Sequence, residues 1–221
     1  SNLALKPDTT RKIFIAGDST VENWNRAGDR AGWGQMLQKF CPPDVRVINL
    51  AVGGRGTRSF VDEKRWEKLL AQLSPGDLVL IQFGHNDQKK DSPERYAPAD
   101  GSYQEYLKRF IADVRERKGE VVLCTPVARR IFDGAKVRNT LGGYPEAVRK
   151  VGAETGTPVI DLYNATVAAL EKYGPEKSAE LFYVTPEQQP DRTHFNRAGA
   201  ELVAGEVARA LKEKQLPAPR E

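Results

Sequence analysis

The sequence predicts an α/β sandwich, in which a central parallel β-sheet lies between two layers of helices. Five short apolar runs with little polar alternation suit strands that are buried on both faces, as in a parallel sheet. These runs are 13–16, 45–50, 78–81, 121–124 and 159–160. Amphipathic helical patterns separate them, and alternating strands and helices are typical of a doubly wound sheet. We therefore expect a three-layer domain with about five parallel strands.

Apolar residues at helical spacing mark the helices that should cover this sheet. The clearest patterns are Trp66, Leu69, Leu70 and Leu73; Tyr103, Tyr106, Leu107, Phe110, Ile111 and Val114; and Val203, Val207, Ala210 and Leu211. Asn196 precedes the last pattern and is a suitable N-cap. The stretches 87–101 and 126–145 are expected to be long loops, and long loops inside a compact domain are more often functional than idle.

The composition is that of one folded domain. The chain has 221 residues, of which 39% are hydrophobic and 29% charged, so disorder is not expected. We expect a single domain over residues 1–221, with its core at about 12–212. The net charge of +4 mildly favours acidic partners. The basic residues are spread along the chain, which argues against a nucleic-acid partner.

The hydropathy pattern bears on membranes and on the compartment. No apolar run approaches 18 residues, so no transmembrane helix and no membrane partner are expected. The N-terminal segment SNLALKPDTT is too polar and too short for a signal peptide. The protein is therefore expected in the cytoplasm, unless a leader before residue 1 was removed, in which case it is secreted or periplasmic. The sequence does not indicate which oligomeric state the protein has.

Cysteine and histidine are rare, and this excludes several kinds of site. The only cysteines are Cys41 and Cys124, so neither a disulfide-rich scaffold nor a four-thiolate zinc site is possible. Cys41 should follow a helix and Cys124 should lie in a buried strand, so we expect two free thiols. The only histidines are His85 and His194, which excludes a three-histidine metal centre. No metal site is expected.

Polar residues follow the predicted strands where ligands bind in a parallel sheet, outside the carboxyl ends. Ser19 lies on a turn beside a glycine after the first run, where its hydroxyl can protrude as a nucleophile. Asp191 and His194 are three positions apart on a predicted turn before the last helix, so the carboxylate can hold the imidazole as a base. Each feature alone is more often structural, but together they predict acyl-transfer chemistry.

Acyl transfer also requires hydrogen-bond donors for the developing oxyanion. The backbone N–H of Ser19 is one candidate. A second comes from the glycines after the second run, where either Gly54 or Gly53 can turn an N–H inward. The side-chain amide of Asn86, after the third run, is a third. A phosphate-binding loop is a weak alternative, because the chain lacks both GxxxxGK[ST] and GxGxxG.

The segments IFIAGDST, NLAVGGRG, FGHND and DRTHF together resemble the SGNH (GDSL-type) hydrolases. The resemblance implies a flavodoxin-like sheet, no cofactor, and a nucleophile, acid and base at Ser19, Asp191 and His194. It places the oxyanion donors at Ser19, Gly54 (or Gly53) and Asn86. The variant GDST, the triplet Gly-Trp-Gly at 32–34 and DRTHFNRAGAE are similar to the rhamnogalacturonan acetylesterase branch. Fungal members of that branch carry disulfides, which this chain is not expected to form.

The branch implies a serine esterase that removes O-acetyl groups from pectic polysaccharide, with an acetylated polysaccharide or oligosaccharide as its partner. Trp24, Arg55 and His85 are the expected substrate contacts, with Arg55 facing a galacturonate carboxylate. The alternatives, that Arg55 only fixes its loop and that His85 is only structural, are equally open. An acetylxylan or general short-chain carbohydrate esterase is the alternative. A lysophospholipase or thioesterase, a catalytically silent carbohydrate-binding protein and a nucleotide-binding protein are more distant alternatives.

Overall fold

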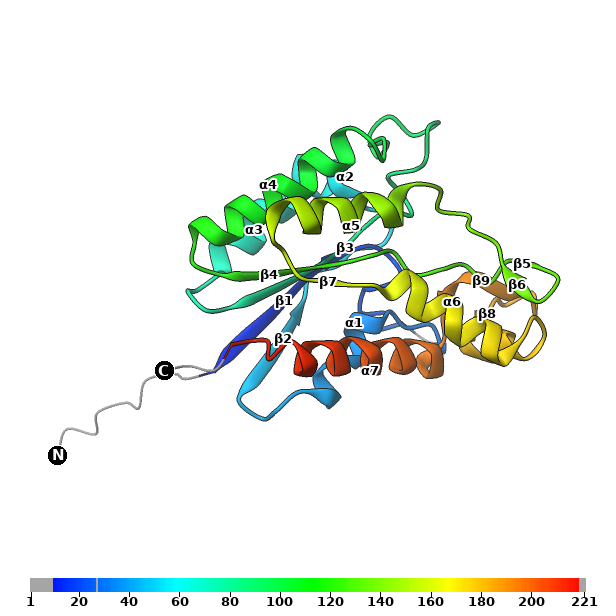
Figure 1. The fold of residues 1–221 in the computed structure, drawn as a ribbon. Helices are drawn as coiled ribbons and strands as arrows, with labels where there is room; N and C mark the ends of the chain where they lie inside the picture. The colour runs from blue at the N-terminus through cyan, green and yellow to red at the C-terminus, as the bar shows by residue number, and fades with distance from the viewer. Residues whose placement is uncertain (1–9, 27, 219–221) are drawn as a thin grey trace.

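A five-stranded parallel sheet forms the centre of the computed structural model, which describes residues 10–26 and 28–218 (Figure 1). The strands are β1 (Arg11–Gly17), β2 (Val45–Asn49), β3 (Leu78–Gln82), β4 (Glu120–Cys124) and β7 (Val159–Ile160). They lie in the order β2-β1-β3-β4-β7, each parallel to its neighbours. The predicted α/β fold with a flavodoxin-like sheet is confirmed, and each apolar run forms one strand.

The sheet is buried on both faces, which explains why its strands lack polar alternation. In β1, Ile13 and Ile15 pack into the core on one face, while Phe14 and Ala16 pack into the core on the other. All four side chains are fully buried. Successive side chains of a strand point to opposite faces, so an uninterrupted apolar run is what two cores require.

Helices cover both faces of the sheet (Figure 1). One layer contains α1 (Trp33–Met36), α6 (Leu162–Tyr173) and α7 (Arg197–Glu213), and the other contains α2 (Thr57–Asp62), α3 (Arg65–Gln72), α4 (Ser102–Glu116) and α5 (Tyr144–Thr155). The short helices η1 (Gln38–Phe40) and η2 (Lys177–Leu181) complete the helical elements of the described residues. The three predicted helices correspond to α3, α4 and α7. Asn196 caps α7 as expected, since its side chain accepts the N–H of Gly199 at 2.9 Å.

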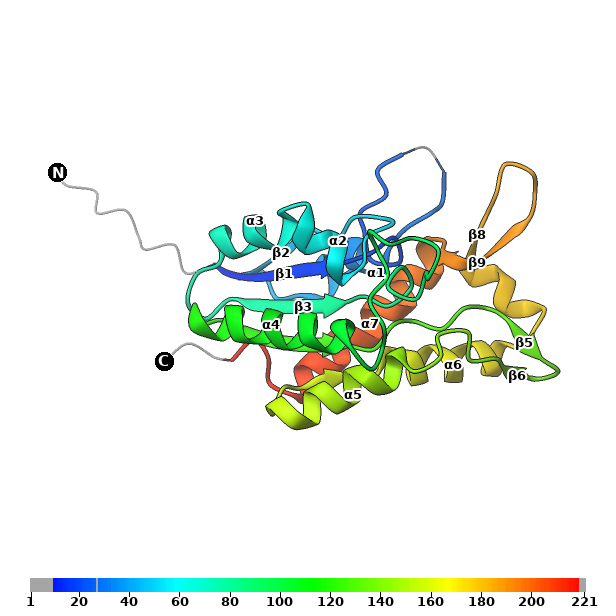
Figure 2. The ribbon, with the colours of Figure 1, turned by 90° about the horizontal axis from the view of Figure 1, so that it is seen from above.

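Two antiparallel hairpins lie outside the central sheet. β5 (Phe132–Asp133) pairs with β6 (Lys136–Val137) inside a stretch that was expected to be a loop. β8 (Phe182–Val184) pairs with β9 (Pro190–Phe195), and β9 carries the DRTH segment. The expectation that this segment lies on a turn was wrong, because it belongs to β9, whose end residues Pro190 and Phe195 pair with β8 across a register shift. Figure 2 shows β8–β9 at the same end of the molecule as the loops that follow β1 and β3.

Both cysteines are free thiols, as expected. Burial raises the pKa of Cys124 to about 12 and also raises that of Cys41. Over the described part of the chain, no helix is both long and apolar enough to span a bilayer. The same residues contain no group of three or more His, Cys, Asp or Glu side chains able to hold a metal ion. Residues 1–9, on which the prediction of the compartment depends, lie outside the described residues.

Candidate active site

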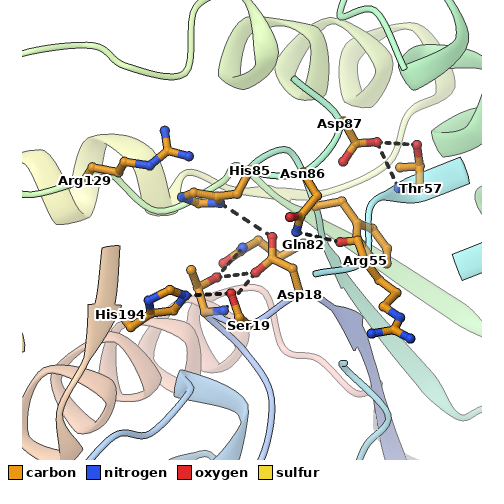
Figure 3. Close-up of polar contacts among 12 residues, drawn as sticks. Asp18, Ser19, Arg55, Thr57, Gln82, His85, Asn86, Asp87, Arg129 and His194 are labelled. Atoms are coloured by element: carbon orange, nitrogen blue, oxygen red, sulfur yellow. Dashed lines mark hydrogen bonds and ion pairs between the residues drawn. The ribbon is translucent and has the colours of Figure 1, made fainter. Parts of the chain in front are cut away.

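Ser19, His194 and Asp191 form a hydrogen-bonded chain at the carboxyl end of the sheet, and Figure 3 shows its contact between Ser19 and His194. Ser19 lies on the turn directly after β1, and its Oγ is 2.9 Å from Nε2 of His194. The Nδ1 atom of His194 is 3.0 Å from Oδ2 of Asp191. The structure therefore brings the three predicted residues together in the order that a serine nucleophile, its base and an orienting acid require.

Asp191 is held by the backbone of its own strand. Its Oδ1 accepts the backbone N–H of Thr193 and that of His194, each at 2.7 Å. Burial alone would raise the pKa of Asp191, but these donors and the imidazole outweigh it and hold the pKa below its usual range. The carboxyl group is therefore ionised at neutral pH and accepts Nδ1–H of His194. This leaves the Nε2 lone pair to accept the hydroxyl proton of Ser19.

A buried relay of hydrogen bonds anchors the turn that carries Ser19. Asp18 accepts the backbone N–H of Thr20 at 2.9 Å and its hydroxyl at 2.7 Å, both on Oδ1. The Thr20 hydroxyl in turn accepts Nε2–H of Gln82, which ends β3, at 2.9 Å. The Gln82 carbonyl accepts the indole N–H of Trp33 at 2.8 Å. Because all of these residues except Ser19 are fully buried, the nucleophile stands on a rigid turn.

His85 faces the other oxygen of Asp18. The distance from His85 Nδ1 to Asp18 Oδ2 is 3.5 Å, and the two side chains are 5% and 0% exposed. Burial would raise the pKa of Asp18, but His85 and the donors of Thr20 lower it overall. Neither ring nitrogen of His85 makes a hydrogen bond among the described residues. His85 therefore lies at the site as expected, with a carboxylate on one side and Nε2 unsatisfied.

The predicted oxyanion donors lie around Ser19, and contacts fix their orientation. Asn86 donates one N–H of its amide to the backbone carbonyl of Arg55 at 3.0 Å. Its Oδ1 accepts from Nζ of Lys89 at 3.1 Å, so the nitrogen and oxygen ends of the amide are assigned. The amide has a second N–H, which is left for a ligand. Asn86 is almost completely buried.

The two candidate glycines have different surroundings. A Cβ on Gly53 would lie 2.3 Å from Oε2 of Glu22 and 3.3 Å from Cβ of Ser19. Gly54 has a φ of +78° and nothing within 4 Å of such an atom, so it requires glycine for conformation rather than for space. Burial raises the pKa of Glu22, while Arg30 and the Gly53 N–H oppose that rise. Gly53 is thus packed closely against Glu22 while Gly54 is open, and Gly54 stays the predicted donor.

Asp87 lies directly after Asn86 and connects two loops of the site. Its Oδ1 accepts the backbone N–H of Thr57 at 2.9 Å and the Thr57 hydroxyl at 2.5 Å. Its backbone carbonyl accepts the hydroxyl of Tyr144 at 3.0 Å. Burial raises the pKa of Asp87 to about 7, although the Thr57 hydrogen bonds oppose the rise. Asp87 thereby joins the Asn86 loop to the first turn of α2 and to α5.

Trp24 and Arg55, the other expected substrate contacts, are partly occupied by protein groups. The guanidinium of Arg30 stacks over the Trp24 ring at 4.0 Å from its centroid. Arg55 donates to Oε1 of Glu63 at 3.0 and 3.1 Å and to the carbonyl of Gly53 at 2.8 Å. The contact with Gly53 stabilises the glycine loop, and the contacts with Glu63 neutralise the charge of the Arg55 guanidinium. Substrate contact by either residue stays a prediction.

Several polar residues of the site were missed by sequence reasoning. They are Asp18, Glu22, Gln82, Asp87, Lys89 and Arg129. Gln82 had a detectable signal, because a glutamine between Ile81 and Phe83 interrupts a run that should be buried on both faces. Asp18 and Asp87 adjoin Ser19 and Asn86, but adjacency does not reveal which partners they meet. Lys89 and Arg129 carried no signal beyond their place in the two long loops.

The comparisons with known proteins agree with this geometry. The GDSL-like Lipase/Acylhydrolase family matches residues 15–202, and the chain belongs to that family. It is thus an esterase of the SGNH type. It is homologous to rhamnogalacturonan acetylesterases, as two relatives from Bacillus subtilis show.

The first relative is the probable rhamnogalacturonan acetylesterase YesY, 38% identical over 205 residues that cover 93% of this chain and 94% of YesY. The second is the rhamnogalacturonan acetylesterase RhgT, 39% identical over 216 residues, 93% of this chain and 91% of RhgT. The crystal structure of YxiM from the same organism matches with a TM-score of 0.84 at 29% identity. The match covers 96% of this chain, which spans 58% of the YxiM chain.

Proposed function

We propose that this protein is a serine acetylesterase that removes O-acetyl groups from rhamnogalacturonan through an acyl-enzyme intermediate. The observation that carries the proposal is the chain of hydrogen bonds from Ser19 through His194 to Asp191. The choice of substrate is supported by RhgT, a rhamnogalacturonan acetylesterase, and YesY, a probable one, which both align with nearly the whole chain. The proposal assigns catalysis to Ser19, His194 and Asp191.

In the first half of the reaction, Ser19 Oγ attacks the carbonyl carbon of the acetyl group while its proton moves to Nε2 of His194. Asp191 stabilises the imidazolium through Nδ1–H. The carbonyl oxygen becomes an oxyanion, which the N–H groups of Ser19 and Gly54 and the second amide N–H of Asn86 stabilise. The bond from carbon to the sugar oxygen then breaks, and His194 gives its proton to that oxygen.

In the second half, water hydrolyses the acetylated serine. Nε2 of His194, now neutral, takes a proton from water as the water oxygen attacks the acetyl carbon. The same donors stabilise the second oxyanion. When the bond between carbon and Ser19 Oγ breaks, His194 returns the proton to Ser19, and acetate leaves. One ester and one water thus become one sugar hydroxyl and acetic acid, with the enzyme unchanged.

Acetate release tests the proposal when it is measured on acetylated rhamnogalacturonan, acetylated xylan and aryl esters with acyl chains of increasing length. We expect the highest kcat/KM on acetylated rhamnogalacturonan and a loss of about 10⁴-fold or more in Ser19→Ala. Ser74→Ala, an exposed serine, is the matched control and should keep its activity.

Three results would contradict the proposal in different ways. A preference for xylan would support the acetylxylan alternative, and a preference for long acyl chains would support the lysophospholipase alternative. Near-normal turnover by Ser19→Ala would refute the nucleophile itself. A fluorophosphonate probe gives a further check, because it should label the wild type and Ser74→Ala but not Ser19→Ala.

A further inference from the structure

Cationic side chains from the two long loops gather around Asn86, next to the candidate nucleophile. Lys89 donates to Oδ1 of Asn86 at 3.1 Å, and Arg95 approaches the same oxygen at 3.4 Å. Arg129 comes from the other loop and donates to the Thr140 hydroxyl at 3.1 Å. Lys89 and Arg95 thus place two positive charges on Asn86, and Figure 3 shows Arg129 on the His85 side of the site. The oxygens to which Lys89 and Arg129 donate are neutral.

Anionic partners for these cations are scarce. Within residues 10–26 and 28–218, no carboxylate lies within ion-pair distance of Lys89 or Arg129, and Arg95 has only Glu94 at 3.6 Å. Burial lowers the pKa of Lys89, and the charges of Arg95 and Arg129 lower it further. Burial lowers the pKa of Arg129 as well. The buried carboxylate of Asp18 opposes both pKa shifts. Like charges repel, so a further anion bound beside these cations would lower their mutual repulsion.

A buried polar group without a hydrogen bond lies in the same place. His85 is 4% exposed, and neither of its ring nitrogens has a hydrogen-bond partner. Figure 3 shows its ring directed at Asp18, which leaves Nε2 on the other side. Buried polar atoms in native proteins are nearly always hydrogen-bonded. A buried imidazole with an unsatisfied Nε2 at the candidate site therefore points to a ligand with a polar group such as a hydroxyl.

Hydrogen bonds hold the two loops that carry these cations in place. Thr140 joins the two loops, since its carbonyl accepts Nε2–H of Gln88 at 3.2 Å and its hydroxyl accepts Arg129. Tyr144 donates to the carbonyl of Ala97 at 2.7 Å and to that of Asp87. A preorganised cationic site loses little conformational entropy when an anion binds.

We propose that Lys89 and Arg129 form a carboxylate subsite that binds a uronate residue adjoining the acetylated sugar. The inference rests on the proposed function and names the residues that select an acidic polysaccharide. The guanidinium of Arg129 offers two parallel donors for the carboxylate, and Lys89 adds a point charge. His85 offers Nε2 to a neighbouring sugar hydroxyl. Arg55 is less suited to this role, because Glu63 already neutralises it.

Inhibition by short galacturonate oligosaccharides tests the subsite without polysaccharide turnover. Hydrolysis of an aryl acetate is measured with trigalacturonate or its carboxyl-reduced, neutral counterpart as inhibitor. We expect trigalacturonate to inhibit the wild type competitively, and Arg129→Gln and Lys89→Gln to raise its Ki about 10- to 100-fold, the range for one hydrogen bond to a charged group. The neutral counterpart should inhibit wild type and variants equally weakly. Lys90→Gln, an exposed neighbour, is the matched control and should leave the Ki unchanged.

Each outcome decides between the subsite and the proposed function. If trigalacturonate does not inhibit the wild type, or if both inhibitors weaken equally in Arg129→Gln, the subsite is refuted. If trigalacturonate inhibits as expected but acetylated rhamnogalacturonan releases no acetate, the subsite stands and the proposed function fails. With acetylated rhamnogalacturonan as substrate, Arg129→Gln should lose about 10- to 100-fold in kcat/KM, and carboxyl reduction of the polymer should abolish its difference from wild type.

Discussion

Nδ1 of His85 lies 3.5 Å from Oδ2 of Asp18, and both side chains are buried beside the candidate nucleophile. The second oxygen of the same carboxylate holds Thr20, which follows Ser19. Asp18 therefore connects the turn after β1 to the loop after β3, and through that loop to Asn86. The contact explains how two loops that are far apart in the sequence hold the nucleophile and an oxyanion donor at fixed positions relative to each other.

Replacing Asp18 should destabilise the protein strongly. Asp18→Ala leaves the His85 imidazole and both Thr20 donors without a buried partner, so we expect the free energy of unfolding to fall by about 3 kcal/mol. Urea unfolding at pH 7 measures the change. Asp62→Ala removes an exposed carboxylate and should change the stability by less than about 0.5 kcal/mol. A loss in Asp18→Ala no larger than that of Asp62→Ala would contradict a structural role for this pair.

Asp87 should give the stability a pH dependence of unusual sign for an aspartate. Its folded pKa is raised to about 7, whereas an unfolded aspartate titrates near about 3.9. Between these values the folded state binds more protons, so this group's contribution to stability falls as pH rises from about 4 to about 7, by up to about 1.4 kcal/mol per pH unit. It changes no further above that range.

The variant Asp87→Asn isolates this contribution. An asparagine keeps an oxygen for the Thr57 donors but cannot ionise, so the variant should gain stability relative to wild type as pH rises from 4.5 to 7.5. Urea unfolding at intervals of about one pH unit measures the difference. Asp91→Asn, an exposed site in the same loop, should follow the wild type. Parallel curves for Asp87→Asn and wild type would show that the carboxyl group is ionised throughout.

Asn86 should act on kcat rather than on KM. Arg55 and Lys89 orient its amide, and its free N–H is assigned to the oxyanion, which exists only in the transition state. Asn86→Ala should therefore lower kcat about 10²- to 10³-fold on an aryl acetate, with little change in KM. Asn139→Ala, on an exposed turn, is the control. A change confined to KM would mean that Asn86 only binds the substrate.

The two glycines of the oxyanion loop should respond differently to alanine. In Gly53→Ala the new methyl group meets Glu22 and Ser19, so we expect a loss of stability of about 1–3 kcal/mol and a lower kcat. Adding Glu22→Ala makes room for the methyl group and should restore part of the stability. In Gly54→Ala the space is free, and only the positive φ opposes the change, at about 1 kcal/mol. Equal losses without recovery by Glu22→Ala would contradict this packing.

Much of the fold could be predicted from the sequence because buried strands and helices have characteristic local patterns of apolar residues. Runs such as 78–81 lie between two cores, and this requires apolar side chains at consecutive positions. Helical periodicity located α3, α4 and α7, and Asn196 marked the start of α7 because its side chain satisfies a free N–H of the first turn. Ser19 and Asn86 could be proposed for one site because parallel strands present their carboxyl ends at one edge, whereas His194 was proposed from its spacing to Asp191.

The rest depends on which side chains meet, and only the tertiary structure decides that. Residues 191–194 belong to a strand rather than a turn because β8 pairs with Pro190 and Phe195 on either side of them, with a register shift between, and nothing in the segment itself shows this pairing. The contact of Asp18 with His85 and the hydrogen bond from Gln88 to Thr140 join loops that are distant in the chain. Sequence periodicity indicates which positions are buried, because the local backbone conformation decides which side chains share a face. The partner of a buried charge depends on the order and register of strands, which arise only when the whole sheet assembles.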